Sequence, residues 1–262
     1  MSRSSGFTLI ELVIVIVLLA IVATISVQFV ALSTRGALDV GSRQQRALQS
    51  VVISEQITRE VREAFPLSVR SNGPCLEWLP IVAATRYERL TTGPDFDEVT
   101  ISPFGRAVSG GLRAIVYGYG SGQSALYDNL NPGPVSPPID PVSAGDTALH
   151  FSGTASHRFR ERSPEKRIFV VGNRVSICQN TDRLYRFSGY SHGSGQPDQT
   201  TLMASGTGAV LGANVEPGSV EFRVTPPSLQ RAAVVSFAFQ LVDPQSGETT
   251  LVTQEVQVRN VP

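Results

Sequence analysis

The feature that most constrains this chain is a long apolar run close to its N-terminus. Residues 7–32 contain a single charged residue, Glu11, and the first proline of the chain is Pro66. A helix of about 20 apolar residues, rising 1.5 Å per residue, spans a bilayer core about 30 Å thick. We therefore expect residues 7–32 to form one transmembrane helix.

Glu11 is the exception within this run. A charged side chain inside a membrane helix costs on the order of 2.5–3.5 kcal/mol, so such residues usually mark a function. Glu11 lies only four residues after Phe7, at the shallow end of the predicted helix. A carboxylate that reaches the lipid headgroups, or that is protonated, is therefore the alternative interpretation.

The residues around Glu11 form a recognisable motif. Gly6-Phe7, followed by Thr8-Leu9-Ile10-Glu11-Leu12, resembles the signature of type IV prepilins: a short charged leader ending in glycine, then phenylalanine, then glutamate. The resemblance implies that residues 1–6 are a leader, that a prepilin peptidase cuts between Gly6 and Phe7, and that Phe7 is N-methylated. It also implies that Glu11 pairs with the Phe7 amine of a neighbouring subunit, which sets the axial stagger, since a buried carboxylate requires such a partner.

A conventional secretory signal is the competing interpretation of the same segment. Such a signal has a basic start, about 7–15 apolar residues and a small-residue cleavage site. Here the leader contains only Arg3, and the apolar run is longer and carries an acid. Arg3 places the leader in the cytoplasm and the rest of the chain outside, following the positive-inside rule.

Residues 33–65 continue as a helix of a different kind. Apolar residues recur there mostly at three- and four-residue spacings, which places them on one face. Glu55, Arg59 and Glu63 follow one another at four-residue spacing, which is typical of a solvated face. Gly36 and Gly41 weaken the join, and Pro66 ends the helix. The predicted buried face consists of Leu48, Val51, Val52, Ile57, Val61 and Phe65.

From residue 67 onward the pattern changes to short runs of Val, Ile, Phe and Thr separated by Gly, Pro, Asn and Asp, which predicts a β-rich domain over residues 67–262. The orientation of the apolar helix and the prepilin resemblance imply that this domain is periplasmic. Residues 171–174 and 244–247 are predicted tight hairpins, and the proline-rich residues 129–145 an irregular loop. The fold class is therefore α+β, with the helix covering an antiparallel sheet. The predicted strands are 75–82, 98–102, 112–118, 147–152, 167–171, 174–178, 184–187, 219–225, 233–242 and 249–258.

Composition limits the remaining options. The chain has 22 basic and 22 acidic residues, and this balance argues against a nucleic-acid-binding surface. Its two cysteines, Cys75 and Cys178, allow one disulfide, which an oxidising compartment favours. Two buried thiols are the alternative.

The β-rich part carries a second, more distant resemblance. The segments 75–81, 175–178, 184–187 and 256–262 are similar to motifs of the MshO-type minor pilins of the mannose-sensitive haemagglutinin (MSHA) pilus, which are related in build to J-type minor pseudopilins. This implies a protein of the inner membrane that later enters a pilus fibre. Its partners would be the major pilin, other minor pilins, the prepilin peptidase and the inner-membrane assembly platform. The outer half of the membrane helix lacks the proline that many pilins have.

No residue pattern predicts a catalytic site, a metal site or a cofactor. Residues 189–193 fit the G-x-S-x-G pattern of hydrolases, but no convincing helix start follows Ser191. The three histidines match no zinc spacing, and the glycine-rich residues 118–122 lack the lysine of a phosphate loop. The acidic residues of 95–98 could offer oxygen ligands to calcium, but no second acidic cluster accompanies them in the sequence. A basic patch at 158–162 with Lys166 and Arg167 indicates a solvated face or a docking surface.

We therefore expect a structural subunit rather than an enzyme. The alternatives are a J-like pseudopilin of a type II secretion system, which genome neighbours would separate, and a pilus-displayed adhesin that binds through residues 129–145. A tethered hydrolase using Ser191 is the remaining alternative.

Overall fold

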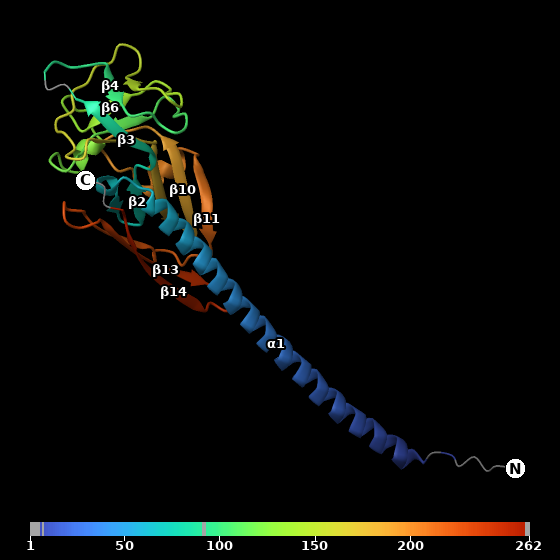
Figure 1. The fold of residues 1–262 in the computed structure, drawn as a ribbon. Helices are drawn as coiled ribbons and strands as arrows, with labels where there is room; N and C mark the ends of the chain where they lie inside the picture. The colour runs from blue at the N-terminus through green and yellow to red at the C-terminus, as the bar shows by residue number, and fades with distance from the viewer. Residues whose placement is uncertain (1–5, 7, 91–92, 260–262) are drawn as a thin grey trace. The chain divides into compact units, whose positions relative to one another are not determined.

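A computed structural model describes residues 6, 8–90 and 93–259. The chain forms two compact units, residues 1–48 and residues 49–262. The helix α1 (Leu9–Arg62) begins in the first unit and ends in the second (Figure 1). It passes Gly36 and Gly41 without interruption, because each has open space around it and needs no special backbone conformation.

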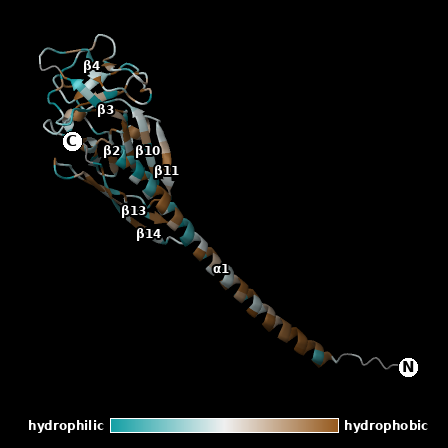
Figure 2. Cartoon of the chain, in the orientation of Figure 1, coloured by the Kyte–Doolittle hydropathy of each residue, from teal (hydrophilic) through white to brown (hydrophobic). Residues whose placement is uncertain are grey.

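The first unit consists mainly of the apolar part of α1. Figure 2 shows this part of the helix as almost uniformly hydrophobic. It contains an 18-residue window that is long and apolar enough to cross a membrane, and none of that window is buried inside the structure. Side chains such as Ile10 and Leu19 are more than 60% exposed in the single chain, as expected for a segment whose natural surroundings are lipid or other apolar helices.

The second unit begins with the last turns of α1, which pack against two antiparallel sheets. The five-stranded sheet has the order β1-β2-β9-β10-β11, and the three-stranded sheet the order β12-β13-β14. Their strands are β1 (Arg70–Asn72), β2 (Cys75–Trp78), β9 (Arg174–Asn180), β10 (Arg183–Tyr190), β11 (Gly208–Ala213), β12 (Glu221–Thr225), β13 (Val234–Val242) and β14 (Thr249–Gln257).

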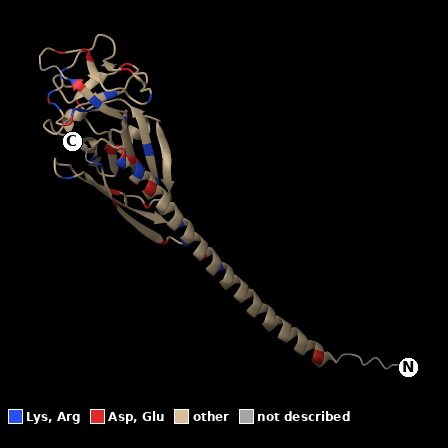
Figure 3. Ribbon diagram, viewed as in Figure 1, with Lys and Arg blue, Asp and Glu red and all other residues tan. Residues whose placement is uncertain are grey.

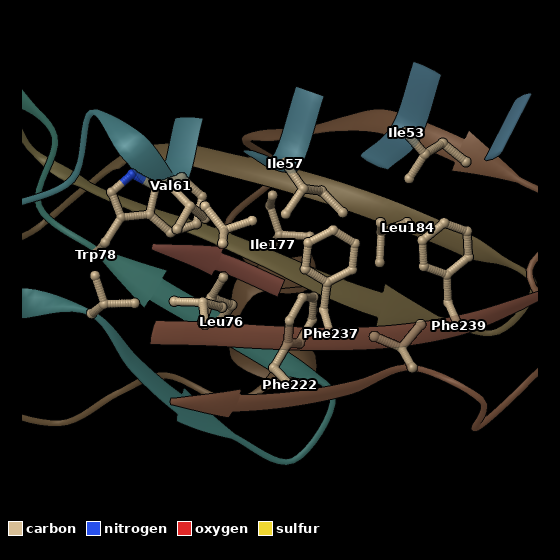
Figure 4. Close-up of a cluster of buried hydrophobic side chains, with 14 of the residues drawn as sticks. Ile53, Ile57, Val61, Leu76, Trp78, Ile177, Leu184, Phe222, Phe237 and Phe239 are labelled. Atoms are coloured by element: carbon tan, nitrogen blue, oxygen red, sulfur yellow. The ribbon is translucent and has the colours of Figure 1, made fainter. Parts of the chain in front are cut away.

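One continuous core joins α1 to both of these sheets. In Figure 4, Ile53, Ile57 and Val61 of the helix point toward Ile177 and Phe237 of the strands. The burial of β13 alternates along its whole length, so one face of the three-stranded sheet lies on this core and the other faces solvent. The predicted α+β fold, a long helix packed on antiparallel sheet, is confirmed.

A third sheet is built entirely from residues that lie between the two cysteines in sequence. Its order is β6-β5-β8-β3-β4-β7, and it has a hydrophobic core of its own. We call residues 81–171 the insert. Its strands are β3 (Ile81–Arg89), β4 (Glu98–Ile101), β5 (Arg113–Ile115), β6 (Val135–Pro138), β7 (Ala148–His150) and β8 (Arg167–Val171). The short helices of the chain are η1 (Pro66–Ser68), η2 (Ser124–Leu126) and α2 (Gln199–Ala204).

The chain enters and leaves the insert along two adjacent crossings. The predicted strand 75–82 is two strands, β2 and β3, which are separated by Leu79 and Pro80. The two strands belong to different sheets. The chain returns from the insert at Gly172, whose backbone N–H donates to Pro80 O at 2.9 Å. The predicted tight hairpin at 171–174 is therefore wrong, because β8 and β9 are also in different sheets. The hairpin predicted at 244–247 is confirmed, with Val242 paired to Thr249.

Two further predictions are corrected by the structure. Of the predicted buried face, Ile57, Val61 and Phe65 are buried, whereas Leu48, Val51 and Val52 are about 60% exposed. The buried side of α1 follows Ile53, Ile57 and Val61. The error arose because two apolar stripes run along this helix, and periodicity alone does not say which one meets the sheet. Residues 129–145 are not wholly irregular either, since they contain β6, which pairs with β5 at the edge of the third sheet, a position where prolines are tolerated.

Candidate functional site

The first turn of α1 has a polar arrangement within an apolar segment. The helix begins at Leu9, so Thr8 occupies the N-cap position and Glu11 the third helical position. The backbone N–H of Glu11 donates to the Thr8 hydroxyl at 3.4 Å and to Thr8 O at 3.1 Å. The hydroxyl in turn donates to Glu11 Oε2 over a long distance of 3.5 Å. This T-x-x-E arrangement resembles a capping box.

The position of Glu11 in the helix also has an electrostatic consequence. The unpaired N–H groups of a helix start carry partial positive charge, which favours an acid in the first turn. Glu11 is the only acid in that turn, and Figure 3 shows one acidic residue near the start of an otherwise uncharged stretch of helix. The turn therefore stabilises the carboxylate in part, and a further cation close to the helix start would stabilise it more.

The predicted processing residues lie directly before this turn. Gly6 is exposed, and no atom lies within 4 Å of the position that a side chain would occupy. Phe7, the predicted first residue of the mature chain and the predicted site of N-methylation, lies outside the described residues, as do residues 1–5 of the predicted leader.

The comparison with known families bears on these same residues. Residues 1–27 match the model of the prokaryotic N-terminal methylation motif. The chain carries a prepilin methylation motif. Because the match coincides with the apolar half of α1, it supports a type IV pilin-like protein, and the prepilin motif implies processing by a prepilin peptidase and pilus assembly. No curated protein and no solved structure matches the chain, so the likeness to MshO-type minor pilins has no support beyond the short segments quoted above.

The disulfide is the second predicted feature that the structure contains. Cys75 on β2 and Cys178 on β9 are bonded, with their Cα atoms 4.2 Å apart at directly paired positions of the two strands. The alternative of two free thiols is therefore excluded. The bridge lies at the base of the insert. It joins β2, which precedes the insert in the chain, to β9, which follows it.

A buried ionic centre, which the sequence analysis did not find, lies on the same strands. The carboxylate of Glu77 on β2 is fully buried and accepts hydrogen bonds from Arg70 Nε at 2.6 Å and from the Tyr190 hydroxyl at 2.8 Å. Arg174 Nη1 on β9 donates to Glu77 Oε1, the oxygen that also accepts from Tyr190, at 3.3 Å. Two arginines and one tyrosine therefore satisfy a single buried acid, which is the condition for a buried charge to be tolerated.

The same two arginines hold the segment that follows β10. Arg174 donates to the backbone carbonyls of Ser191, Gly193 and Gly195, and Arg70 donates to Ser194 O at 2.7 Å. This glycine-rich segment has no regular structure, so the guanidinium groups provide its hydrogen bonds. The two arginines of the Glu77 centre thereby hold the segment that contains the G-x-S-x-G pattern in place.

This arrangement argues against the hydrolase interpretation of Ser191. A nucleophile elbow requires a helix directly after the serine. Here β10 ends at Tyr190, the next helix begins only at Gln199, and Ser191 is exposed with its carbonyl bound to Arg174. The structure therefore does not form the elbow.

His192 lies partly buried in the same segment. Its ring stacks on Tyr127 at a centroid distance of 6.1 Å, and Tyr127 in turn stacks on the guanidinium of Arg70. Burial, together with the positive charges of Arg113, Arg174 and Arg70, lowers the pKa of His192 to about 4. Burial raises the pKa of the Tyr190 hydroxyl, as does the neighbouring Glu77 charge. His192 is therefore a neutral packing group at neutral pH.

The other candidate residues of the sequence are not brought together. His150 lies near Glu98, while His157 is buried among Phe151 and Phe159. Burial lowers the pKa of His157. Across the residues that the structure describes, no group of three or more His, Cys, Asp or Glu side chains has the arrangement of a metal site. The Glu77 centre could not be found from sequence, because no sequence pattern links Arg70, Glu77 and Arg174, which meet only through strand pairing.

Proposed function

We propose that this protein is a minor pilin of a type IV pilus of the MSHA type, which primes or caps fibre assembly. The observation that carries the proposal is the methylation motif over residues 1–27, placed on a helix whose only acid in the first turn is Glu11. In this function, residues 7–32 hold the chain in the inner membrane and the domain over residues 67–262 lies in the periplasm. The prepilin peptidase cuts between Gly6 and Phe7, and Phe7 is then N-methylated.

Assembly of the fibre follows from the chemistry of that cut. Cleavage creates an amine on Phe7 close to the start of the helix, and Glu11 of an adjacent subunit pairs with it when the axial stagger is correct. Two buried charges are each costly alone and tolerable together, so an incorrect stagger is disfavoured. The exposed apolar side chains of the helix, including Leu19 and Phe29, supply the lateral packing with the major pilin and other minor pilins.

The test of this function is mass spectrometry of the N-terminal peptide from protein purified out of the native host. The expected product begins with N-methylated phenylalanine derived from Phe7. A chain that keeps Met1, or that is cut after the apolar segment, would overturn the proposal. Co-purification with pilus fibres rather than with a type II secretion pseudopilus distinguishes the minor pilin from a J-like pseudopilin.

A second candidate function is supported by the insert. An adhesin displays a receptor-binding part at the fibre surface, and here residues 81–171 form a sheet with a hydrophobic core separate from that of the helix. A glycan-binding screen of the full-length protein, with and without substitutions in the insert, tests this function independently of processing.

A further inference from the structure

A hollow on the insert collects basic side chains that lack acidic partners. It has a volume of about 570 Å³ and lies between the end of β3 and the turn that precedes β8. Its floor is formed by the buried residues Tyr87, Leu90 and Ser163, and its rim by the exposed side chains of Glu88, Arg89, Arg162 and Lys166. We call this the cationic hollow.

The positive charges of the rim are not neutralised by the protein. Arg162 Nη2 donates to Leu90 O at 3.0 Å, and Lys166 Nζ approaches Glu88 O at 3.4 Å. These contacts are with carbonyl oxygens, which orient the cations and leave their charge uncompensated. Among the residues that the structure describes, Arg89, Arg162 and Lys166 form no ion pair, whereas the nearby Arg86 pairs with Glu165 at 3.3 Å.

Lys166 has a backbone conformation that glycine adopts more easily. Its φ of 54° lies in the left-handed region, which favours glycine. The conformation is held on both sides, because Lys166 N–H donates to Ser163 O at 3.0 Å and Lys166 O accepts from Tyr87 N–H at 2.9 Å. Lys166 is also the only lysine in the chain. A lysine that lies in a backbone conformation suited to glycine points to a use for its ammonium group.

The chemistry of the hollow selects one class of ligand. A carboxylate fits a site with two oriented cations, and the neighbouring Glu88 carboxylate is suited to accept hydrogen bonds from the hydroxyl groups of a saccharide. Single-stranded nucleic acids need exposed aromatic rings for stacking, and the tyrosine of this hollow, Tyr87, is buried with its hydroxyl bound to Ser163 O. We propose that the cationic hollow binds an acidic saccharide, with its carboxylate between Arg162 and Lys166 and its hydroxyls facing Glu88.

This proposal specifies a ligand for the adhesin function. It rests on that proposed function only in assuming that the insert is displayed at the fibre surface. Binding is measured on purified protein, so a negative result removes the saccharide site and leaves processing and fibre assembly untouched. Conversely, an unprocessed N-terminus removes the pilin function and leaves the binding measurement valid.

The first experiment is isothermal titration calorimetry of the full-length protein in a non-ionic detergent. The probe is an oligogalacturonate, and the comparison ligands are a neutral malto-oligosaccharide and a single-stranded oligonucleotide. We expect binding of the oligogalacturonate that weakens as salt is raised, and no binding of the neutral saccharide. Absence of oligogalacturonate binding, or equal or tighter binding of the oligonucleotide, would overturn the proposal.

The second experiment uses two double variants that remove the same charge. Arg162→Gln with Lys166→Gly removes two cations from the hollow, and glycine suits the left-handed backbone at position 166. Arg183→Gln with Arg223→Gln removes two exposed cations elsewhere. Loss of two charge-assisted contacts should weaken binding at least about tenfold in the first variant, while the control stays within about twofold. An equal loss in both variants would show general charge attraction and overturn the site.

Discussion

Cys75 and Cys178 occupy directly paired positions on adjacent strands, and all six strands of the insert lie between them in sequence. The disulfide therefore closes the base of a module that has its own core. Residues 103 positions apart are joined at the point where the chain leaves the main domain and returns to it.

Removal of this bridge is expected to destabilise the domain. In the double variant Cys75→Ser with Cys178→Ser, the unfolded chain gains the freedom of a loop of about 100 residues, which is worth up to about 4–5 kcal/mol on the chain-entropy model and usually less. Chemical denaturation followed by far-ultraviolet circular dichroism measures the change. An unfolding free energy equal to that of the wild type would show that strand pairing alone holds the two crossings together.

The Glu77 centre is expected to be sensitive to loss of its acid. Glu77→Gln leaves the buried Arg174 and the partly buried Arg70 without a counter-charge, and breaking a buried pair in this way typically costs about 3–5 kcal/mol. Thermal and chemical unfolding of the purified protein measure the loss. Glu221→Gln is the matched control, because the exposed Glu221–Arg223 pair should contribute no more than about 1 kcal/mol. Similar losses in both variants would contradict the role of Glu77.

The two sides of α1 are expected to respond differently to truncation. Ile57 is fully buried in the main core, so Ile57→Ala should cost about 2–5 kcal/mol through lost contacts and a cavity. Val52 is 62% exposed on the opposite side, so Val52→Ala should change the unfolding free energy by no more than about 0.5 kcal/mol. The reverse ranking of the two variants in denaturant unfolding would contradict the burial of Ile57 and the exposure of Val52.

Stability is expected to fall in acid partly through His192. The pKa of His192 is about 4 in the folded protein and 6.5 in its ordinary state, so the unfolded chain binds more protons between these values. The contribution of the neutral imidazole is fully present above pH 6.5 and is lost as the pH falls toward 4. Melting temperatures at pH 7.5 and pH 5 should therefore differ less in His192→Gln than in the wild type. His157 contributes in the same direction, so a smaller difference must remain in the variant.

Glu11 is expected to control entry into fibres rather than folding of the domain. Glu11→Ala removes the proposed partner of the Phe7 amine, so the variant should be processed and inserted normally and be depleted from sheared fibres. Glu11→Asp keeps the charge on a shorter side chain and should recover part of the incorporation. Quantitative immunoblotting of fibre and membrane fractions gives the ratio. Incorporation of Glu11→Ala at the wild-type frequency would exclude the stagger mechanism.

The N-terminal part of this protein could be predicted from sequence because its features are local. The apolar helix depends on the length of an apolar run, and the position of Glu11 in its first turn depends on Thr8 three residues before it. The final hairpin follows from turn residues between two alternating strands. Each of these features is decided by residues close together in the chain, where propensity and periodicity act directly.

The insert and the Glu77 centre depended on contacts between distant residues. A strand pattern shows that residues 167–171 and 174–178 are extended, and it does not show that the turn between them changes sheets. Arg70, Glu77 and Arg174 are unremarkable surface-type residues in the sequence, and only the pairing of β1 with β2 and of β2 with β9 brings them together. Sequence alone thus determined the long apolar helix and its methylation motif, while the tertiary structure decided what the domain presents, because burial and charge pairing arise only when distant strands meet.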